Sequence, residues 1–519
     1  MLVKIRDMGA NGINSDLAPW DLPPNTLTDG RNFRVMAGKV QSSGGSQLLL
    51  KGARGHIGHC DQTTDFEGTN QWILCHDKGV DTLYNRAFTG IYDTGVDVDP
   101  YQWTTCQIGQ VTFLNHPATG PLYFTDWTSL SEPAKDLPWA PGQTWEQAGM
   151  AARQLHSHKN FLFALGMTEN GEYYEDRVRW SNPCQPNGIP YTWQEPFEDR
   201  SSIAGFVTLG RGGMVVGAES LRDSFVIYSD QAINVMDYTG DALVWRRRTL
   251  SQNAGLVSER SLVEVGGRHF IISHEDIVMF DGNQAESLLH NRLRRRFAQT
   301  LNEDARFRSF AVDNKMTSEI WFCVAEVGHD EPNCAYVFNY RDGSWAIRDL
   351  STSRDFSHAT FGYQPTEVLT WETFGGPERP WLGERTTWAN ANRQNFDNVI
   401  IGVSGDEVHN IDTQYPDDEL TTFVERVAMP MQGHEDVTMM SRIYPQVEGN
   451  TPVKISVGSH HYAGDGAKWK KPVMFDPKTD RKVDIRTSGE LHAFRVEGPA
   501  NGNFNLSGLD IEFQPGGAR

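Results

Sequence analysis

Short apolar runs followed by polar or glycine-containing turns recur along most of the chain. Each run leads through its turn into a second run in which apolar and polar residues alternate. This pattern is typical of antiparallel β-hairpins and not of helices. Seven such hairpins can be counted, and they begin at Trp72, Val111, Phe161, Phe225, Phe270, Ile320 and Val399.

The spacing of these hairpins predicts how they are arranged. They begin about 40 to 80 residues apart, as expected for propeller blades with insertions and not for one tight sandwich. One small sheet cannot bury both of its faces, whereas a ring of sheets buries each sheet against its neighbours. We therefore predict an all-β protein in which residues 51–415 form a β-propeller of about six or seven blades. No WD or kelch signature is present, so the sequence leaves the blade number open.

The pattern changes near residue 415. An acidic linker there is followed by alternating runs whose spacing predicts a C-terminal β-domain of the sandwich type, residues 416–519. Within the propeller, residues 371–398 are too long and too rich in Gly and Pro for a hairpin turn, so we predict an exposed loop. The candidate docking residues of this loop are Trp371, Trp381 and Trp388.

The first 50 residues contain an irregular segment, residues 12–35, which we call the strap. It has three prolines and no sustained period before Asn32. Proline restricts the backbone and disfavours helix just before it, while Trp20 and Leu22 offer apolar anchors. A segment with so little core of its own should lie extended on something else. We predict that it packs on the C-terminal domain or on a neighbouring subunit, with a blade of its own propeller as the alternative.

Charge and cysteine usage limit the possible functions. Acidic residues outnumber basic residues by 67 to 47, which gives a net charge of −20 and no general attraction to nucleic-acid phosphates. The six cysteines are dispersed without a CxxC pair, so we expect buried free thiols in a reducing compartment. We see no signal-peptide pattern and no run of 18 apolar residues, so we expect folding in a cytoplasm.

Motifs that carry catalytic chemistry are absent from the sequence. There is no GxSxG elbow, no GxxxxGK phosphate loop and no HExxH zinc helix. A zinc site could be built from His56, His59 and Cys60, with Cys75 or His76 of the adjacent strand as a further ligand. A calcium site could be built from Asp93, Asp97 and Asp99. Ordinary blade-edge residues and a solvated acidic loop are the favoured interpretations, so we assign no catalytic, metal-binding or cofactor-binding residue.

Basic residues cluster at positions 246–248 and 292–296 of this acidic chain. In the second cluster Leu293, Phe297 and Leu301 recur every four positions, which predicts a short helix with one buried stripe. Its arginines could meet carboxylates of a neighbouring subunit, could contact DNA phosphates, or could form a solvated face. The candidate subunit-interface residues are Trp20, Arg292, Arg295 and Arg296.

The strap, GINSDLAPWDLPPNTLTDGRNFRV, and the following GKVQSSGG closely resemble the start of tail nozzle proteins of short-tailed bacteriophages. These proteins are also called tail tubular or packaged-DNA stabilisation proteins. The resemblance is strongest in NAGLVSERSLVEVGGRHFIISHEDIVMFDG and the NRLRRRF that follows it. It continues in NHPATGPLYF, SFVIYSDQAINVMDYTG, RIYPQVEG and GNFNLSGLDIEFQPGG, so it touches nearly the whole chain except residues 371–398.

The resemblance implies a structural virion protein and not an enzyme. Family members form rings of six subunits below the portal and adaptor, with a propeller facing outward from each subunit. The ring encloses the channel through which double-stranded DNA leaves, and it retains the packaged genome. We therefore expect a homo-hexameric ring in the virion tail, assembled in the host cytoplasm, that docks the adaptor–portal complex and tail fibres. An acidic lumen would let DNA pass without sequence-specific contact, since many Lys or Arg residues would hold its phosphates.

Two other functions fit an acidic propeller. A glycan-binding or glycan-cleaving propeller acting on the host surface could use some of the fifteen Trp residues as sugar-stacking platforms. Most of them, however, lie beside predicted strands, where packing explains them. The second alternative is an intracellular propeller scaffold with no role in a phage.

Overall fold

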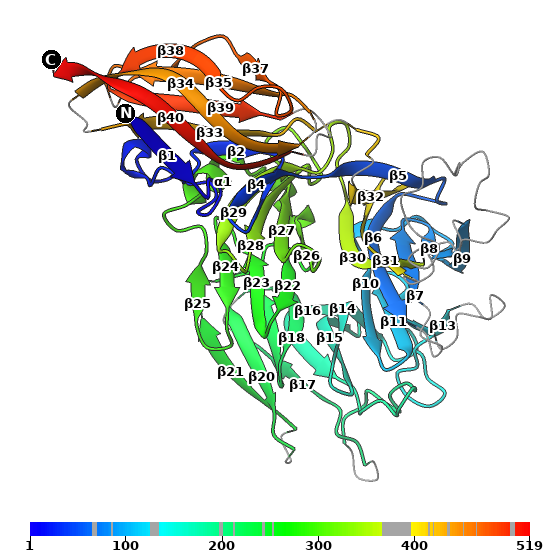
Figure 1. The fold of residues 1–519 in the computed structure, drawn as a ribbon. Coiled ribbons are helices and arrows are strands. Elements are labelled where there is room, and N and C mark those ends of the chain that lie inside the picture. The colour runs from blue at the N-terminus through cyan, green and yellow to red at the C-terminus, as the bar shows by residue number, and fades with distance from the viewer. Residues whose placement is uncertain are drawn as a thin grey trace, which may run out of the picture.

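The protein is described here by a computed structural model. It describes residues 1–518 except 65–69, 85–86, 125–133, 197–200, 211–212, 241–243, 252–253, 366–395, 414–415, 419, 433–435, 450, 463 and 499–503. Two β-rich bodies are seen in Figure 1, a ring of small sheets and a two-layer body that lies above it.

The lower body consists of seven four-stranded antiparallel sheets within the described residues. Blade 1 contains β6 (Ile57–Thr64), β7 (Asn70–His76), β8 (Gly79–Tyr84) and β9 (Ala87–Asp93). Blade 2 contains β10 (Thr104–Ile108), β11 (Val111–His116), β12 (Gly120–Phe124) and β13 (Lys135–Asp136). Blade 3 contains β14 (Met150–His158), β15 (Phe161–Glu169), β16 (Glu172–Trp180) and β17 (Gly205–Thr208). Blade 4 contains β18 (Val215–Leu221), β19 (Ser224–Ser229), β20 (Ile233–Tyr238) and β21 (Trp245–Ser251).

The remaining blades complete the ring. Blade 5 contains β22 (Leu262–Val265), β23 (Arg268–Ile272), β24 (Ile277–Phe280) and β25 (Ala285–Ser287). Blade 6 contains β26 (Phe310–Asn314), β27 (Glu319–Val324), β28 (Cys334–Asn339) and β29 (Ser344–Asp349). Blade 7 contains β30 (His358–Pro365), β31 (Phe396–Ser404), β32 (Glu407–Thr413) and, from the start of the chain, β5 (Gly45–Lys51). Since β30 contacts β6, the last blade meets the first and the propeller is closed.

The upper body is a sandwich of two sheets. One sheet contains β1 (Leu2–Arg6), β3 (Phe33–Met36), β4 (Lys39–Ser42), β34 (Asp436–Gly449), β38 (Val483–Gly489) and β40 (Phe504–Ala518). The other contains β2 (Asp29–Arg31), β33 (Phe423–Pro430), β35 (Val453–His460), β36 (Lys468–Trp469), β37 (Val473–Phe475) and β39 (Leu491–Glu497). In β38 the side chains alternate strictly between buried and exposed, as expected for a strand with one face on the core.

Helices are short in the described part of the chain. They are α1 (Arg294–Thr300) and the 3-10 helices η1 (Pro19–Asp21), η2 (Pro100–Gln102) and η3 (Glu303–Arg308). The predicted helix with a buried stripe is found as α1, with Phe297 fully buried and Leu293 and Leu301 just outside its ends.

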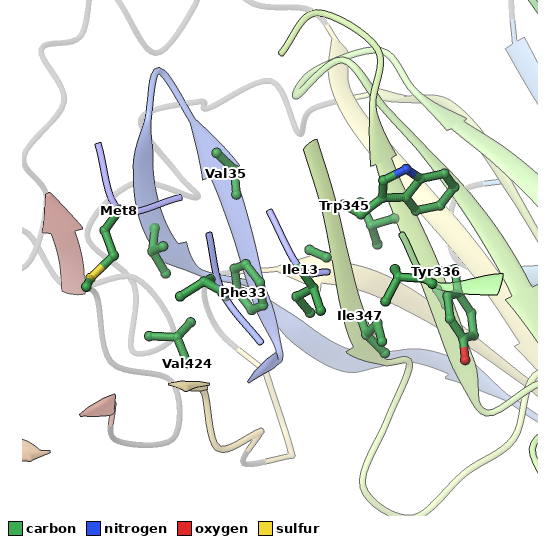
Figure 2. Close-up of a cluster of buried hydrophobic side chains, with 14 of the residues drawn as sticks. Met8, Ile13, Phe33, Val35, Tyr336, Trp345, Ile347 and Val424 are labelled. Carbon is green, nitrogen blue, oxygen red and sulfur yellow. The ribbon is translucent and has the colours of Figure 1, made fainter. Parts of the chain in front are cut away.

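One hydrophobic core joins the two bodies. Figure 2 shows Ile13 and Phe33 of the N-terminal segment close to Trp345 and Ile347 of blade 6, with Val424 of the sandwich in the same cluster. All five side chains are at most 1% exposed. The sandwich and the propeller therefore share buried apolar surface, which is the dominant favourable term in packing.

The prediction of an all-β propeller with an additional sandwich-like domain is confirmed, with seven blades among the described residues. Each of the seven predicted hairpins begins in the second strand of a blade. The first 51 residues, however, do not form one unit. β1 to β4 belong to the sandwich, whereas β5 is the outer strand of blade 7, pairing with β32. The strap lies on both the sandwich and blade 6.

Candidate functional site

The strap runs along β29, the outer strand of blade 6. The backbone N–H of Ile13 donates to the Trp345 carbonyl at 2.9 Å, and that of Asn32 donates to the Ile347 carbonyl at 2.9 Å. Gly12, just before the first of these contacts, has φ +62°, and a Cβ there would lie 2.3 Å from the Trp345 nitrogen. Only glycine tolerates both the left-handed backbone and this close approach, so Gly12 lets the strap lie against the blade.

A buried charged cluster links the sandwich to blades 6 and 7. Asp412, at the end of β32, accepts hydrogen bonds from Arg34 of β3 at 2.5 Å and from Arg348 of β29 at 3.0 Å. The backbone N–H of Gly44 donates to the same carboxylate at 2.9 Å. Burial alone would raise the pKa of Asp412, but the two guanidinium groups outweigh it and lower the pKa to about 2. The carboxylate is therefore ionised and held by partners from three parts of the fold.

A second charged cluster lies where β2 meets blade 6. Arg31 of β2 contacts Glu326 at 2.7 Å and Asp349 at 2.6 Å. The Asn32 amide donates to Asp349 at 2.9 Å, and the Asp349 backbone N–H donates back to the Asn32 side chain at 2.7 Å. These groups form part of the wall of a pocket of about 650 Å³, together with His329 and the loop at residues 351–355. In this wall Arg31 is paired with Glu326 and Asp349, and His329 lies 2.9 Å from Asp355.

The arginines that we named as interface candidates lie beside the strap. Asp16 accepts hydrogen bonds from the backbone N–H groups of Arg294 and Arg295 at 2.9 and 3.2 Å, which satisfies free donors at the start of α1. Arg292 donates to the Asn11 carbonyl at 3.1 Å. The basic segment that the sequence singled out thus anchors the strap of its own chain.

The three candidate arginines differ in how their side chains are used. Arg296 forms an ion pair with Asp29 of β2 at 2.5 Å, and Arg292 is bound to the strap. Arg295 is exposed, and its guanidinium forms no ion pair or hydrogen bond with the described residues. Only Arg295 therefore presents an unengaged cation at this surface.

Trp20 lies in η1 and is half-buried, beside β33 of the sandwich. The following Leu22 carbonyl accepts a hydrogen bond from the fully buried Arg426 of β33 at 3.0 Å. This end of the strap is thus fixed on the sandwich of its own chain. The other candidate docking residues, Trp371, Trp381 and Trp388, lie outside the described residues.

The histidines near the suggested zinc site are occupied by other contacts. The His76 Nδ1 atom accepts from the Lys78 backbone N–H at 3.1 Å, and His59 Nε2 pairs with the Thr105 hydroxyl at 3.0 Å. Cys60 donates its backbone N–H to His358 at 3.2 Å. Among the described residues no group of three His, Cys, Asp or Glu side chains could hold a metal ion. His76 instead closes the β7–β8 turn.

The loop at residues 258–261, between blades 4 and 5, ties distant blades together. Arg260 donates to the carbonyl of Gly58 in β6 of blade 1 and to that of Tyr101 in η2, just before blade 2. Glu259 accepts from the buried Gln154 amide of blade 3, and the Arg260 carbonyl accepts from blade 6. Burial raises the pKa of Glu259 to about 7. This loop lies within the SERS of the segment that carries the strongest resemblance, yet sequence reasoning gave it no role.

A cluster of polar side chains from three loops lies near Arg260. Tyr101 donates its hydroxyl to Glu331, and His56 Nε2 lies 2.9 Å from the same hydroxyl. Burial, with the Glu331 carboxylate beside it, raises the pKa of Tyr101 above its usual range. A phenol that ionises so reluctantly is a poor nucleophile. The cluster therefore links loops of blades 1, 2 and 6.

Tryptophan burial bears on the glycan alternative. Nine of the eleven Trp residues in the described part of the chain are buried, and Trp20 and Trp469 are the other two. Buried indoles pack between strands and cannot stack on sugars. No helix among the described residues is long and apolar enough to span a membrane.

Comparison with known proteins gives little further guidance. No family model matches the sequence, and no curated protein matches it. The chain is similar to the solved structure of YCF48 bound to D1 peptide, with 9% identity over 76% of this chain and 99% of that chain and a TM-score of 0.37. It is similar to the AfRom2 CNH domain at 8% identity over 71% and 99%, with a TM-score of 0.37. Hsv2 of Kluyvelomyces marxianus matches at 7% identity over 71% and 76%, with a TM-score of 0.27. Similarity this low carries no functional argument.

Proposed function

We propose that the protein is a structural subunit of the tail nozzle of a short-tailed phage. In this role six copies form a ring that encloses the DNA exit channel, retains the packaged genome, and docks the adaptor–portal complex and tail fibres. The sequence resemblance motivates the proposal. The observation that carries it is the position of the strap between sandwich and propeller. The strap is part of the sequence that resembles the nozzle proteins, and its residues also join the two bodies.

The strap joint suits a ring subunit for a mechanical reason. A closed ring repeats one contact between identical copies, so the angle between the two bodies of each subunit must be constant. Here three devices fix that angle: the shared core around Phe33 and Trp345, the Asp412 cluster, and the Arg31 cluster. A single linker between independent domains would allow relative motion.

Electrostatics also support a channel protein. With a net charge of −20, copies of this chain around a duplex would repel its phosphates at long range. Some of the basic side chains that could hold DNA are already bound to groups of the same chain, as Arg292 and Arg296 illustrate. Double-stranded DNA would pass such a surface without being retained by phosphate contacts.

The test is to produce phage particles that lack this protein and to measure their DNA with time. We expect particles that package DNA and then lose it, together with electron-microscopy density for the propeller at the tail of complete particles. Supplying the protein in trans is the control and should restore DNA retention. Particles that keep their genome without the protein, or complete particles without it in the tail, would contradict the proposal.

A further inference from the structure

A cationic and apolar surface lies at the open edge of the second sandwich sheet. We call it the β36–β37 edge and define it as residues 462–482. Its exposed large apolar side chains are Tyr462 (61% exposed), Trp469 (39%), Val473 (36%) and Met474 (54%). β36 and β37 pair only with β35, and no other strand of the described chain covers them. Figure 1 shows β37 on the sandwich, away from the blades.

This edge has a charge opposite to that of the rest of the chain. Residues 462–482 contain six basic and three acidic residues, a net +3 in a protein of net −20. Lys470 and Lys471 are exposed and have no ion pair among the described residues. Lys468 and Lys482, by contrast, lie 3.8 and 3.2 Å from carboxylates of their own chain. Two adjacent lysines next to Trp469 are thus free to meet an acidic partner.

The edge is held in a fixed shape before any partner arrives. Trp469 lies over Gly458 of β35, where an added Cβ would come within 3.3 Å of the indole. The Lys470 backbone N–H donates to the Val457 carbonyl at 2.8 Å, which holds the chain just after β36. An ordered aromatic side chain beside exposed cations loses little conformational entropy when it binds.

The complementary surface lies on blade 1. The loop at residues 93–99, between β9 and η2, exposes Asp93, Asp97 and Asp99, and Val96 at its tip is 67% exposed. Two hydrogen bonds order the turn: Gly95 N–H to Asp93 at 2.9 Å and the Thr94 hydroxyl to the Val96 carbonyl at 2.5 Å. Acidic groups around an apolar tip match lysines around an apolar platform. In Figure 1 β9 lies on the propeller and β37 on the sandwich, so the two surfaces belong to different bodies.

We propose that the β36–β37 edge of one copy docks on the 93–99 loop of a second copy of this chain. The inference rests on the proposed function and names a contact of its ring. Since the edge is cationic, it repels itself and cannot form a symmetric pair. The contact must join two different surfaces, and such head-to-tail contacts build rings when the rotation closes and filaments when it does not.

The test compares assembly of purified variants by sedimentation velocity and mass photometry, alone and with the adaptor–portal complex. Lys470→Glu/Lys471→Glu should weaken self-association at least tenfold, and so should Asp97→Lys/Asp99→Lys. Mixing the two variants should restore association, because the reversed charges again attract each other. Lys4→Glu/Arg486→Glu is the matched control, because both side chains are exposed on the other sheet, form no ion pair among the described residues and give the same change of charge. It should assemble normally. Circular dichroism of each variant verifies that the monomer is folded.

The outcomes separate this contact from the proposed function. If Lys470→Glu/Lys471→Glu assembles as the wild type does, the docking inference is wrong while the ring and its role in the tail stand. If the wild type never self-associates, even on the adaptor–portal complex, both fail. Vesicles containing phosphatidylglycerol provide the other arm of the test. Loss of vesicle binding with unchanged assembly in the lysine variant would assign the edge to an anionic lipid surface and overturn the inference.

Discussion

Asp412→Asn is the most direct test of the joint between sandwich and propeller. The substitution removes one negative charge and keeps the size of the side chain. Asp412 has φ +70°, in the left-handed region where Asn and Asp are enriched among residues other than Gly. The backbone should therefore stay in place, and any loss of stability reports the electrostatic role of the carboxylate.

The size of the effect follows from the contacts of the carboxylate. It is 3% exposed and contacts Arg34 and Arg348, of which Arg348 is 1% exposed. Removing one partner of a buried ion pair destabilises a protein by about 3–5 kcal/mol, because the remaining charge is buried without compensation. A pKa lowered from 3.8 to about 2 corresponds independently to about 2.5 kcal/mol. We expect Asp412→Asn to lower the free energy of unfolding by about 2–5 kcal/mol at pH 7.

The effect must also depend on pH in a defined direction. The pKa of Asp412 is lower in the folded state than in the unfolded chain, so its contribution to stability is complete well above pH 3.8. This contribution is lost as the pH falls through 3.8 towards 2. From proton linkage, about half of it should be gone by pH 3. The difference between the wild type and Asp412→Asn should therefore narrow from pH 7 to pH 3.

Urea unfolding followed by tryptophan fluorescence is the assay, since the buried Trp321 packs against Arg348 of this cluster. Asp484→Asn is the matched control, because Asp484 pairs with Arg442 at 2.9 Å on the exposed face of β38. Its unfolding midpoint should stay at the wild-type value. Equal losses in both variants, or a difference for Asp412→Asn that stays constant down to pH 3, would refute the reasoning.

Two further predictions concern the strap and blade 4. Gly12→Ala should displace the strap, because the new Cβ would lie 2.3 Å from the Trp345 nitrogen; limited proteolysis should then cut residues 14–26 faster. Gly171→Ala, also at positive φ but with open space around it, is its control, and equal cleavage in the two variants would contradict the role of Gly12. Burial raises the pKa of Glu219 on β18 to about 7, above its ordinary 4.5, so ionisation destabilises the folded state as the pH rises through 7. Glu219→Gln should exceed the wild type in stability by about 1–3 kcal/mol at pH 8, and a gap of the same size at pH 5 would count against burial as the cause.

Local pattern predicted the second strands of the blades well and the first strands poorly. β7 and β11 are buried almost throughout, so they read as apolar runs in the sequence. β6 and β10 carry polar residues such as Asp61 and Gln107, whose side chains bond neighbouring blades. A polar residue satisfied by a distant strand looks like a loop residue when only its neighbours in sequence are known.

The candidate site was predictable only in part. The basic segment around Arg295 stands out by composition, and the strap stands out by its prolines. The pairing of Arg34 with Asp412 joins residues 378 positions apart, and nothing in the sequence near either residue marks it. The same holds for β5, whose neighbour in the sheet, β32, comes at the other end of the propeller sequence. Such long-range contacts depend on the completed ring, which periodicity does not describe.

The closure of the propeller by β5 has a consequence for how the chain reaches its native state. β1 and β5 are synthesised early, but both pair with strands that are synthesised late. β32, the partner of β5, ends at Thr413, and the partner of β1 in β40 includes Glu512. At synthesis rates of about 5–20 residues per second, these early strands have no partner for about 20–100 s. Because non-local pairing is slow in any case, blade 7 and the sandwich should be the last parts to fold, with β1 and β5 exposed to chaperones and proteases until β40 and β32 have been made.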